Sequence, residues 1–369
     1  MNKNVAMMPD APCADRATAL SALVDEFLML VAETAEYHAE PAIRAVMQEA
    51  QRSLLIVLRR LRVASERYVV GVVGLTNVGK STLLNALLGD ELAPRRNGPC
   101  TAAPIEFVYG SEIRLTTLFQ QGLQRPSWQC GGIAEVHQRL EVLADDAGAE
   151  ASQAIRRITV ELPCPLLKGG LVIADTPGFG AAQAGHATGS HEQALRDYIT
   201  NDVSQVFWVV LAEQGIGKSE MKFHDQFFAG VCEDVIVTGC EGWDQTDRDR
   251  FRRRFSQLFG RRLPQFRFVS GLEGLRARQA HDEGMLEQAG ITKLEERIRD
   301  LASPSGRTAA ISETLLTLAA DLRAWLIDNS ANEWIRTTPW RPDSWDRFST
   351  AAARNDIAAQ LVRRLEFPT

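Results

Sequence analysis

The residues with the clearest chemistry lie between Gly74 and Ser81, in the order Gly-Leu-Thr-Asn-Val-Gly-Lys-Ser. An apolar run at 68–73 precedes them, and a run of good helix formers, 82–88, follows. The pattern G-x-x-x-x-G-K-[ST] between a strand and a helix is typical of a phosphate-binding loop, or P-loop. Its glycines let the backbone wrap phosphate oxygens, and the amides at the helix start point at the anion. The segment therefore predicts nucleotide binding.

Within this segment the side chains have distinct expected roles. Lys80 is expected to reach the β- and γ-phosphates and Ser81 to ligate Mg²⁺ through its hydroxyl, so that both serve catalysis. The predicted nucleotide-binding residues of the segment are Gly74, Asn77, Val78, Gly79, Lys80, Ser81 and Thr82.

Three further positions complete the expected phosphate and metal site. Asp175-Thr-Pro-Gly178 follows a short apolar strand, where the carboxylate can hold Mg²⁺ through water and the glycine amide can reach the γ-phosphate. Thr101 lies in the loop after the P-loop helix, where its hydroxyl can complete the Mg²⁺ shell and sense the γ-phosphate. The expected metal ligands are Ser81, Thr101 and Asp175. Ser270, at the end of the last expected strand, is predicted to place a backbone amide against the base.

The elements that must position these residues alternate between strands and helices. Strands are expected at about 68–73, 104–109, 113–119, 155–162, 171–174, 206–211, 235–237 and 266–270. Helices are expected at about 82–88, 133–143, 191–198, 219–228 and 247–259. This order predicts an α/β fold with a doubly wound, mainly parallel sheet. Ligands of such sheets bind at the carboxyl ends of the strands, where the P-loop and Asp175 both fall.

The flanks of this domain are helical. We expect a flexible tail at 1–14, helices at 15–66, the P-loop domain at 67–303 and further helices at 304–369. The apolar faces of the first and last helices need a partner, which predicts that they form one bundle. Four tryptophans of the last stretch either pack between helices or form a patch for a protein partner or a membrane interface; they are Trp325, Trp334, Trp340 and Trp345.

Composition limits the class of protein. The chain has 369 residues, 45% of them hydrophobic and 24% charged, as in soluble globular proteins of more than one unit. A net charge of -6 argues against a nucleic-acid partner. The cysteines form no C-x-x-C pair, which favours a reducing compartment. Without an apolar leader or a run of about 18 apolar residues, we expect a cytoplasmic protein, free or peripherally attached to a membrane.

The segment Pro94-Arg-Arg-Asn-Gly-Pro-Cys-Thr101-Ala-Ala-Pro104 resembles switch I of dynamin-like GTPases, matching at Pro94, Arg95, Gly98, Thr101 and Pro104. The stretch from Gln205 to Glu220 is similar to a strand and the following helix start of the same family, in its bacterial dynamin-like type. The P-loop is also similar to those of Era and mitofusin GTPases. The resemblance covers about 60–310.

This resemblance implies GTP and GDP as ligands, Mg²⁺ as cofactor, and hydrolysis coupled to assembly through the nucleotide face. The assembly would be a homodimer or a hetero-assembly, and closure would pass to the helical bundle. Phe179 stands where signalling GTPases carry a water-orienting Gln. The resemblance offers K⁺ held by Asn77 as a substitute, which makes Asn77 a catalytic candidate; the alternative for Asn77 is an Asx turn that stabilises the loop.

The base-reading motif departs from the family. GTPases carry N-K-x-D after the strand expected at 235–237, whereas this chain reads Thr238-Gly-Cys-Glu241-Gly-Trp-Asp244. We expect Asp244 to accept the guanine protons through a shifted loop, with Glu241 as the alternative. Guanine specificity is thus implied by the resemblance and is not visible in the motif.

Two other functions stay open at this point. A hydrolysis-poor scaffold that binds nucleotide to regulate a partner is favoured by the altered base motif and opposed by the intact Lys80, Ser81, Thr101 and Asp175. An Era-like GTPase that acts on RNA or the ribosome is suggested by the P-loop and by an arginine-rich run at 248–262. Turnover separates the scaffold from the switch, and RNA co-purification tests the third function.

Overall fold

A computed structural model describes residues 24–25, 28, 31, 40–63, 67–93, 103–119, 127–145, 155–179, 189–228, 231–259 and 263–329. The chain divides into two compact units. One unit comprises residues 66–303, and the other comprises residues 1–65 together with 304–369.

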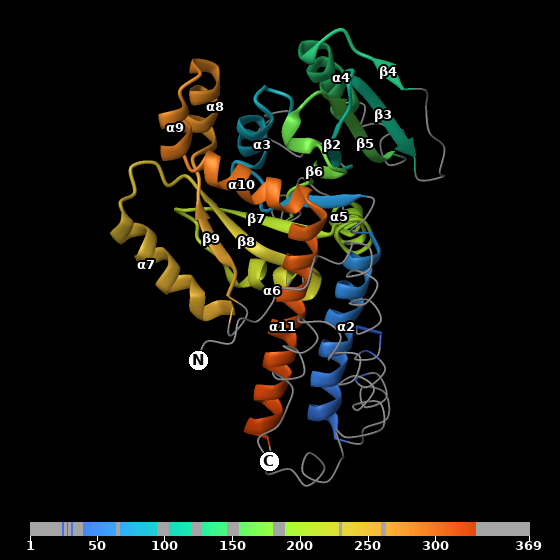
Figure 1. The fold of residues 1–369 in the computed structure, drawn as a ribbon, viewed down its shortest axis with the longest axis vertical. Helices are drawn as coiled ribbons and strands as arrows, with labels where there is room; N and C mark the ends of the chain where they lie inside the picture. The colour runs from blue at the N-terminus through green and yellow to red at the C-terminus, as the bar shows by residue number, and fades with distance from the viewer. Residues whose placement is uncertain are drawn as a thin grey trace, which may run out of the picture. The chain divides into compact units, whose positions relative to one another are not determined.

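The unit from 66 to 303 is built on one sheet, whose strand order is β4-β3-β5-β2-β6-β1-β7-β8-β9 (Figure 1). Its strands are β1 (Tyr68–Val73), β2 (Ile105–Tyr109), β3 (Arg114–Phe119), β4 (Trp128–Gln129), β5 (Ile155–Leu162), β6 (Leu171–Asp175), β7 (Gln205–Leu211), β8 (Cys232–Thr238) and β9 (Gln265–Phe268). The short edge strand β4 was not expected from the sequence.

The sheet is mainly parallel, as predicted. β1 pairs in parallel with β6 and β7, and β8 lies parallel to both β7 and β9. The exceptions are β2, which runs antiparallel to β6, and β3, which runs antiparallel to β4 and β5. Consequently the carboxyl ends of β1, β6, β7, β8 and β9 meet at one edge, and the loops that follow them form the site.

Helices cover both faces of the sheet. The helices of this unit are α3 (Lys80–Leu88), α4 (Ile133–Asp145), α5 (Gly189–Asn201), α6 (Lys218–Phe227), α7 (Gln245–Ser256), α8 (Gly271–Ala280), α9 (Glu283–Gln288) and α10 (Ile291–Ala302). α3 contacts α8 and α10, whereas α5 contacts α6 on the other face (Figure 1). The fold is therefore doubly wound, as expected.

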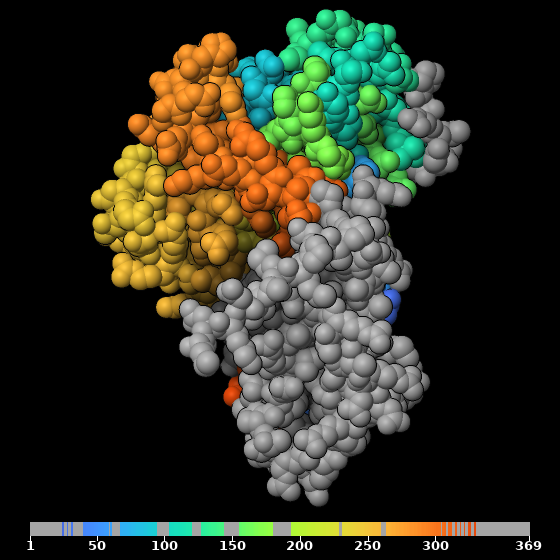
Figure 2. Space-filling view, viewed as in Figure 1, coloured from blue at the N-terminus to red at the C-terminus, as the bar shows by residue number. Residues whose placement is uncertain are grey.

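Helices α8 and α9 were missed by the sequence analysis, which expected a strand up to residue 270. The strand β9 ends at Phe268, and Ser270 instead begins α8, because its hydroxyl accepts the Glu273 amide as an N-cap. α8 then packs closely on the P-loop helix, since a Cβ on Gly271 would lie 3.0 Å from the Leu83 nitrogen. Figure 2 shows α8 to α10 as one continuous orange surface next to the gold surface of α7.

The other unit contains two long helices, α2 (Pro41–Val63) and α11 (Pro304–Asp328), which lie side by side in Figure 1. The fully buried Arg60 donates to the Thr314 hydroxyl at 3.1 Å between them. Of the helical stretches expected at 15–66 and 304–369, most of 15–39 and all of 330–369, which contains Trp334, Trp340 and Trp345, lie outside the described residues.

Candidate nucleotide-binding site

The P-loop has the backbone of a phosphate cradle. Gly79 precedes α3 with φ 89°, and Asn77 takes φ 64°, a left-handed conformation that few residues other than glycine adopt. The buried Lys80 donates from Nζ to the carbonyl oxygens of Gly74 at 3.2 Å and Leu75 at 2.7 Å. The ammonium group is thereby held over the loop, where a phosphate chain would lie. The left-handed conformation at position 77 suits asparagine, whose short polar side chain tolerates it.

Gly74 is required by contact with its neighbours. A Cβ at this position would lie 2.4 Å from the Val209 carbonyl oxygen of β7, a distance that no real side chain tolerates. Because Gly74 has no side chain, the loop that leaves β1 can lie directly against the adjacent strand β7. Thr238, at the end of β8, lies against the same loop: its hydroxyl donates toward the Val78 carbonyl oxygen at 2.6 Å.

Asp175 and Ser81 come together from β6 and α3. The Ser81 hydroxyl donates to Asp175 Oδ2 at 3.1 Å, as expected if both serve one metal ion. Burial raises the pKa of Asp175 to about 6, although Lys80 and the Ser81 hydrogen bond act in the opposite direction. The neighbouring positive charge and hydrogen bond therefore do not offset the cost of burying the ionised carboxylate. A hydroxyl and a buried carboxylate fit the oxygen preference of Mg²⁺, with phosphate oxygens and water as the remaining ligands.

The segment after β6 folds onto the P-loop. The Thr176 hydroxyl donates to the Val72 carbonyl oxygen at 2.8 Å, and a Cβ on Gly178 would lie 2.8 Å from the Thr76 nitrogen. Phe179 forms a parallel bridge with Leu75 and donates its amide to the Gly74 carbonyl oxygen at 3.3 Å. Gly178 thus lies against Thr76 at the edge of the P-loop.

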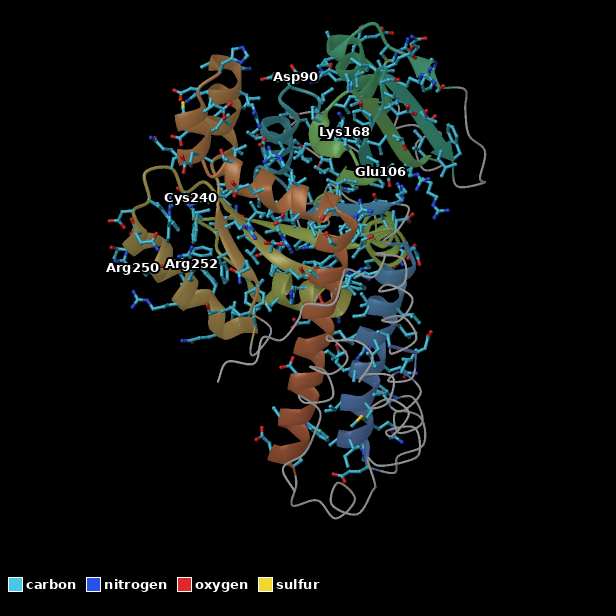
Figure 3. All side chains as sticks on the ribbon, viewed as in Figure 1. Asp90, Glu106, Lys168, Cys240, Arg250 and Arg252 are labelled. Atoms are coloured by element: carbon cyan, nitrogen blue, oxygen red, sulfur yellow. The ribbon has the colours of Figure 1, made fainter. Side chains whose placement is uncertain are left out.

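The loop after β8, which was expected to contact the base, begins one residue later than predicted, because β8 extends to Thr238 and not only to 237. Thr238 links three segments, since the Val78 and Val210 carbonyl oxygens both lie within reach of its hydroxyl. Cys240 follows in the loop between β8 and α7 (Figure 3). Burial raises the pKa of its thiol to about 11, so this thiol stays neutral and fills space.

Two acidic residues of this loop have different partners. Glu241 accepts the Ser270 hydroxyl at 2.6 Å, which joins the loops after β8 and β9. Asp244 instead caps α7 and accepts the Asp247 amide at 2.9 Å. The Ser270 amide donates to the Ala289 carbonyl oxygen at 2.9 Å, so it is not directed at a base as expected. Ser270 instead contributes its hydroxyl, which holds the Glu241 carboxylate.

The Ser270–Glu241 pair was missed by the sequence analysis, although a signal for it existed. Glu241 follows Thr238 by three residues, the same spacing as Asn to Asp in N-K-x-D. The spacing becomes readable once the strand is known to end at Thr238, whose hydroxyl ties the strand end to the P-loop. Thr101 and most of the switch I segment, residues 94–102, lie outside the described residues.

Residues 70–229 match the sequence model of the dynamin family, and this stretch contains the P-loop and the Asp175 segment just described. Residues 70–229 are thus similar to the dynamin family, whose members are GTPases. The chain is 26% identical over 243 residues to a bacterial dynamin-like protein of Nostoc punctiforme, covering 62% of this chain and 33% of that protein. It is 31% identical to rat mitofusin-2 over 110 residues, covering 30% of this chain and 14% of mitofusin-2.

A solved structure of an oligomerised bacterial dynamin pair has a TM-score of 0.46 and 15% identity, covering 99% of this chain and 65% of that one. That pair is described as providing a mechanism for the long-range sensing and tethering of membranes. The chain spans about one third of the length of its Nostoc relative. None of the helices in the described part of the chain combines the length and the apolar character that a membrane span requires.

Proposed function

We propose that this chain is a molecular switch of the dynamin-like type, which binds GTP with Mg²⁺, hydrolyses it, and changes its assembly state with the nucleotide. The observation that carries the proposal is the meeting of Lys80, Ser81 and Asp175 at one end of the sheet, within the stretch that matches the family model. A lysine over the loop and a hydroxyl–carboxylate pair beside it supply the charge that a nucleotide–Mg²⁺ complex requires.

The proposal is tested first by the nucleotide that purifies with the protein and by phosphate release. Denatured protein should yield GDP or GTP on ion-exchange chromatography. Added GTP with Mg²⁺ should be hydrolysed, and EDTA should stop the reaction. Adenine nucleotides in the purified protein, or turnover without a divalent cation, would contradict the proposal.

Guanine recognition in this proposal rests on Glu241 and not on Asp244. Glu241 has a carboxylate held by Ser270, next to the neutral Cys240, and it stands three residues after the strand end at Thr238. A guanine presents two N–H donors on the edge where an acidic side chain accepts. Asp244 is engaged by the start of α7, which supports a structural role for it.

We predict that Glu241→Ala lowers the affinity for GTP by about 10- to 100-fold, because hydrogen bonds to a charged acceptor are worth about 1.5–3 kcal/mol. The affinity for ATP should change little, so the preference for GTP should shrink by the same factor. Calorimetry with non-hydrolysable analogues of GTP and ATP measures both affinities. Asp244→Ala is the matched control: it should cost about 1 kcal/mol of stability through the lost cap and leave the preference intact.

Hydrolysis in this proposal depends on assembly across the nucleotide face. Phe179 is 4% exposed and apolar, so it cannot orient the attacking water. An added cation near the phosphates is worth about 10³–10⁵ in the rate of related reactions. We propose that pairing brings Arg95 or Arg96 of the switch I segment towards the phosphates, and that Asn77 holds K⁺ beside them.

Specific activity is therefore expected to rise with protein concentration and to be higher in K⁺ than in Na⁺ or choline. Asn77→Ala should remove the K⁺ dependence. Because Asn77 has φ 64°, Asn77→Gly is the matched variant that relieves backbone strain while also lacking the amide. Steady-state phosphate release across concentration and cation measures this. Rates that stay flat in both series would favour the hydrolysis-poor scaffold, and retained K⁺ dependence in Asn77→Gly would exclude Asn77 as the ligand.

A further inference from the structure

We propose that Phe223 of α6 is a positioning residue for the γ-phosphate contact, acting through Phe179. The inference rests on the proposed function, because it concerns how the Gly178 amide is held for a γ-phosphate. Its starting point is that the residue after the Asp175–Gly178 motif is not directed at the nucleotide. Phe179 is buried to 4% exposure in a cluster of aromatic rings.

The contact between the two rings is specific. Phe179 and Phe223 stack with centroids 4.5 Å apart and planes within 4° of parallel. Phe223 is itself fixed, since it packs against Phe227 at 4.8 Å and Phe228 at 5.9 Å. The Arg196 guanidinium of α5 covers the same rings, at 5.9 Å from Phe223 and 4.6 Å from Phe227. The side chain of Phe179 thus packs on α6, whose rings are in turn covered by Arg196 of α5.

The backbone of Phe179 is held by the P-loop. Its amide donates to the Gly74 carbonyl oxygen, and it bridges Leu75, while the adjacent Gly178 touches Thr76. A single residue therefore joins the aromatic cluster to the cradle, with Gly178 immediately beside it. Displacing the ring of Phe179 would move the Gly178 amide away from the edge of the cradle, where a γ-phosphate would lie. GDP has no γ-phosphate and should not sense the change.

The test compares Phe223→Leu with wild type for GDP and for a non-hydrolysable GTP analogue, both with Mg²⁺. An aromatic pair is worth about two- to tenfold in an equilibrium constant. The analogue should therefore bind about two- to tenfold more weakly to Phe223→Leu, with unchanged GDP affinity, and kcat should fall. Phe223→Tyr keeps the stacked ring and should restore both values.

Phe259→Leu is the matched control. Phe259 belongs to the same cluster and packs edge-on against Trp208 at 6.0 Å and His224 at 5.3 Å, but it is not among the rings that contact Phe179. The Phe259→Leu variant should have a lower melting temperature and an unchanged ratio of analogue to GDP affinity. A similar change of that ratio in Phe259→Leu would show a general loss of packing and would overturn the proposal.

Other outcomes are equally decisive. Equal weakening of both ligands in Phe223→Leu, no change in either, or tighter binding of the analogue would each overturn the positioning role while leaving the proposed GTPase intact. If wild-type protein bound neither ligand, the proposed function itself would fail. Weakening of the analogue alone, reversed by Phe223→Tyr, supports the inference.

Discussion

Lys80→Ala should reduce the affinity for GTP and GDP by at least about 100-fold, or about 2.7 kcal/mol. The ammonium group is already held over the loop by the carbonyl oxygens of Gly74 and Leu75, so a nucleotide meets a charge in place. Removing the side chain would leave the phosphates without this cation. Calorimetry with both nucleotides measures the loss.

The chain provides a matched control for this variant. Lys218 also begins a helix after a glycine, in Gly217-Lys-Ser219, but Gly217 there is extended and Lys218 is exposed. Lys218→Ala should bind nucleotide as wild type does. Melting curves should confirm that both variants fold. Unchanged GTP affinity in Lys80→Ala, or equal loss in Lys218→Ala, would contradict the assignment of the P-loop.

Asp175→Asn should lower the rate of hydrolysis by at least about 100-fold. The same substitution should stabilise the nucleotide-free protein against unfolding. The activity falls because Mg²⁺ loses its charged ligand. The stability rises because the buried carboxylate, with its pKa raised from 3.8 to about 6, is penalised when ionised. A shift of this size corresponds to at most about 3 kcal/mol at neutral pH.

The pH dependence of this stability gain has a definite sign. A raised carboxyl pKa means that the folded state holds the proton more tightly than the unfolded state. The stability that wild type derives from this group is therefore greatest below about pH 4 and declines as the pH rises to about 6. Asp175→Asn should melt several degrees higher than wild type at pH 7 and at nearly the same temperature at pH 4.

Ser81→Ala is the informative companion variant. It should also lose Mg²⁺-dependent hydrolysis, but it should lower stability, since it removes the hydroxyl that donates to Asp175 Oδ2. Thermal melting without nucleotide across pH 4–7 separates the two variants. A stability change of the same sign in both would show that Asp175 is not under electrostatic strain.

The local motifs were readable because their chemistry lies within one short segment. The P-loop needs two glycines, a lysine and a serine at fixed spacing, and the order of strand, loop and helix supplies the geometry. The same holds for the Asp175–Gly178 turn, which directly follows a buried strand. The alternation of strands and helices likewise predicted a doubly wound sheet, since period and composition are local properties.

Features that join distant segments were not readable. The assignment of the base-reading carboxylate depended on where β8 ends, which is decided by the fit of Thr238 between Val78 and Val210. Helix α8 replaced the end of an expected strand because Ser270 caps it and Gly271 packs on Leu83. Both outcomes follow from contacts between residues far apart in the chain, which local propensity does not contain.

The sequence by itself thus predicted a phosphate-binding P-loop on an α/β sheet, because backbone conformation and charge there are set within eight residues. Only the tertiary structure decided what the neighbouring side chains do. It paired Glu241 with Ser270, used Asp244 as a helix cap, and buried Phe179 against Phe223. The physical reason is that an acidic or aromatic side chain takes its role from its burial and its partners, which the fold supplies.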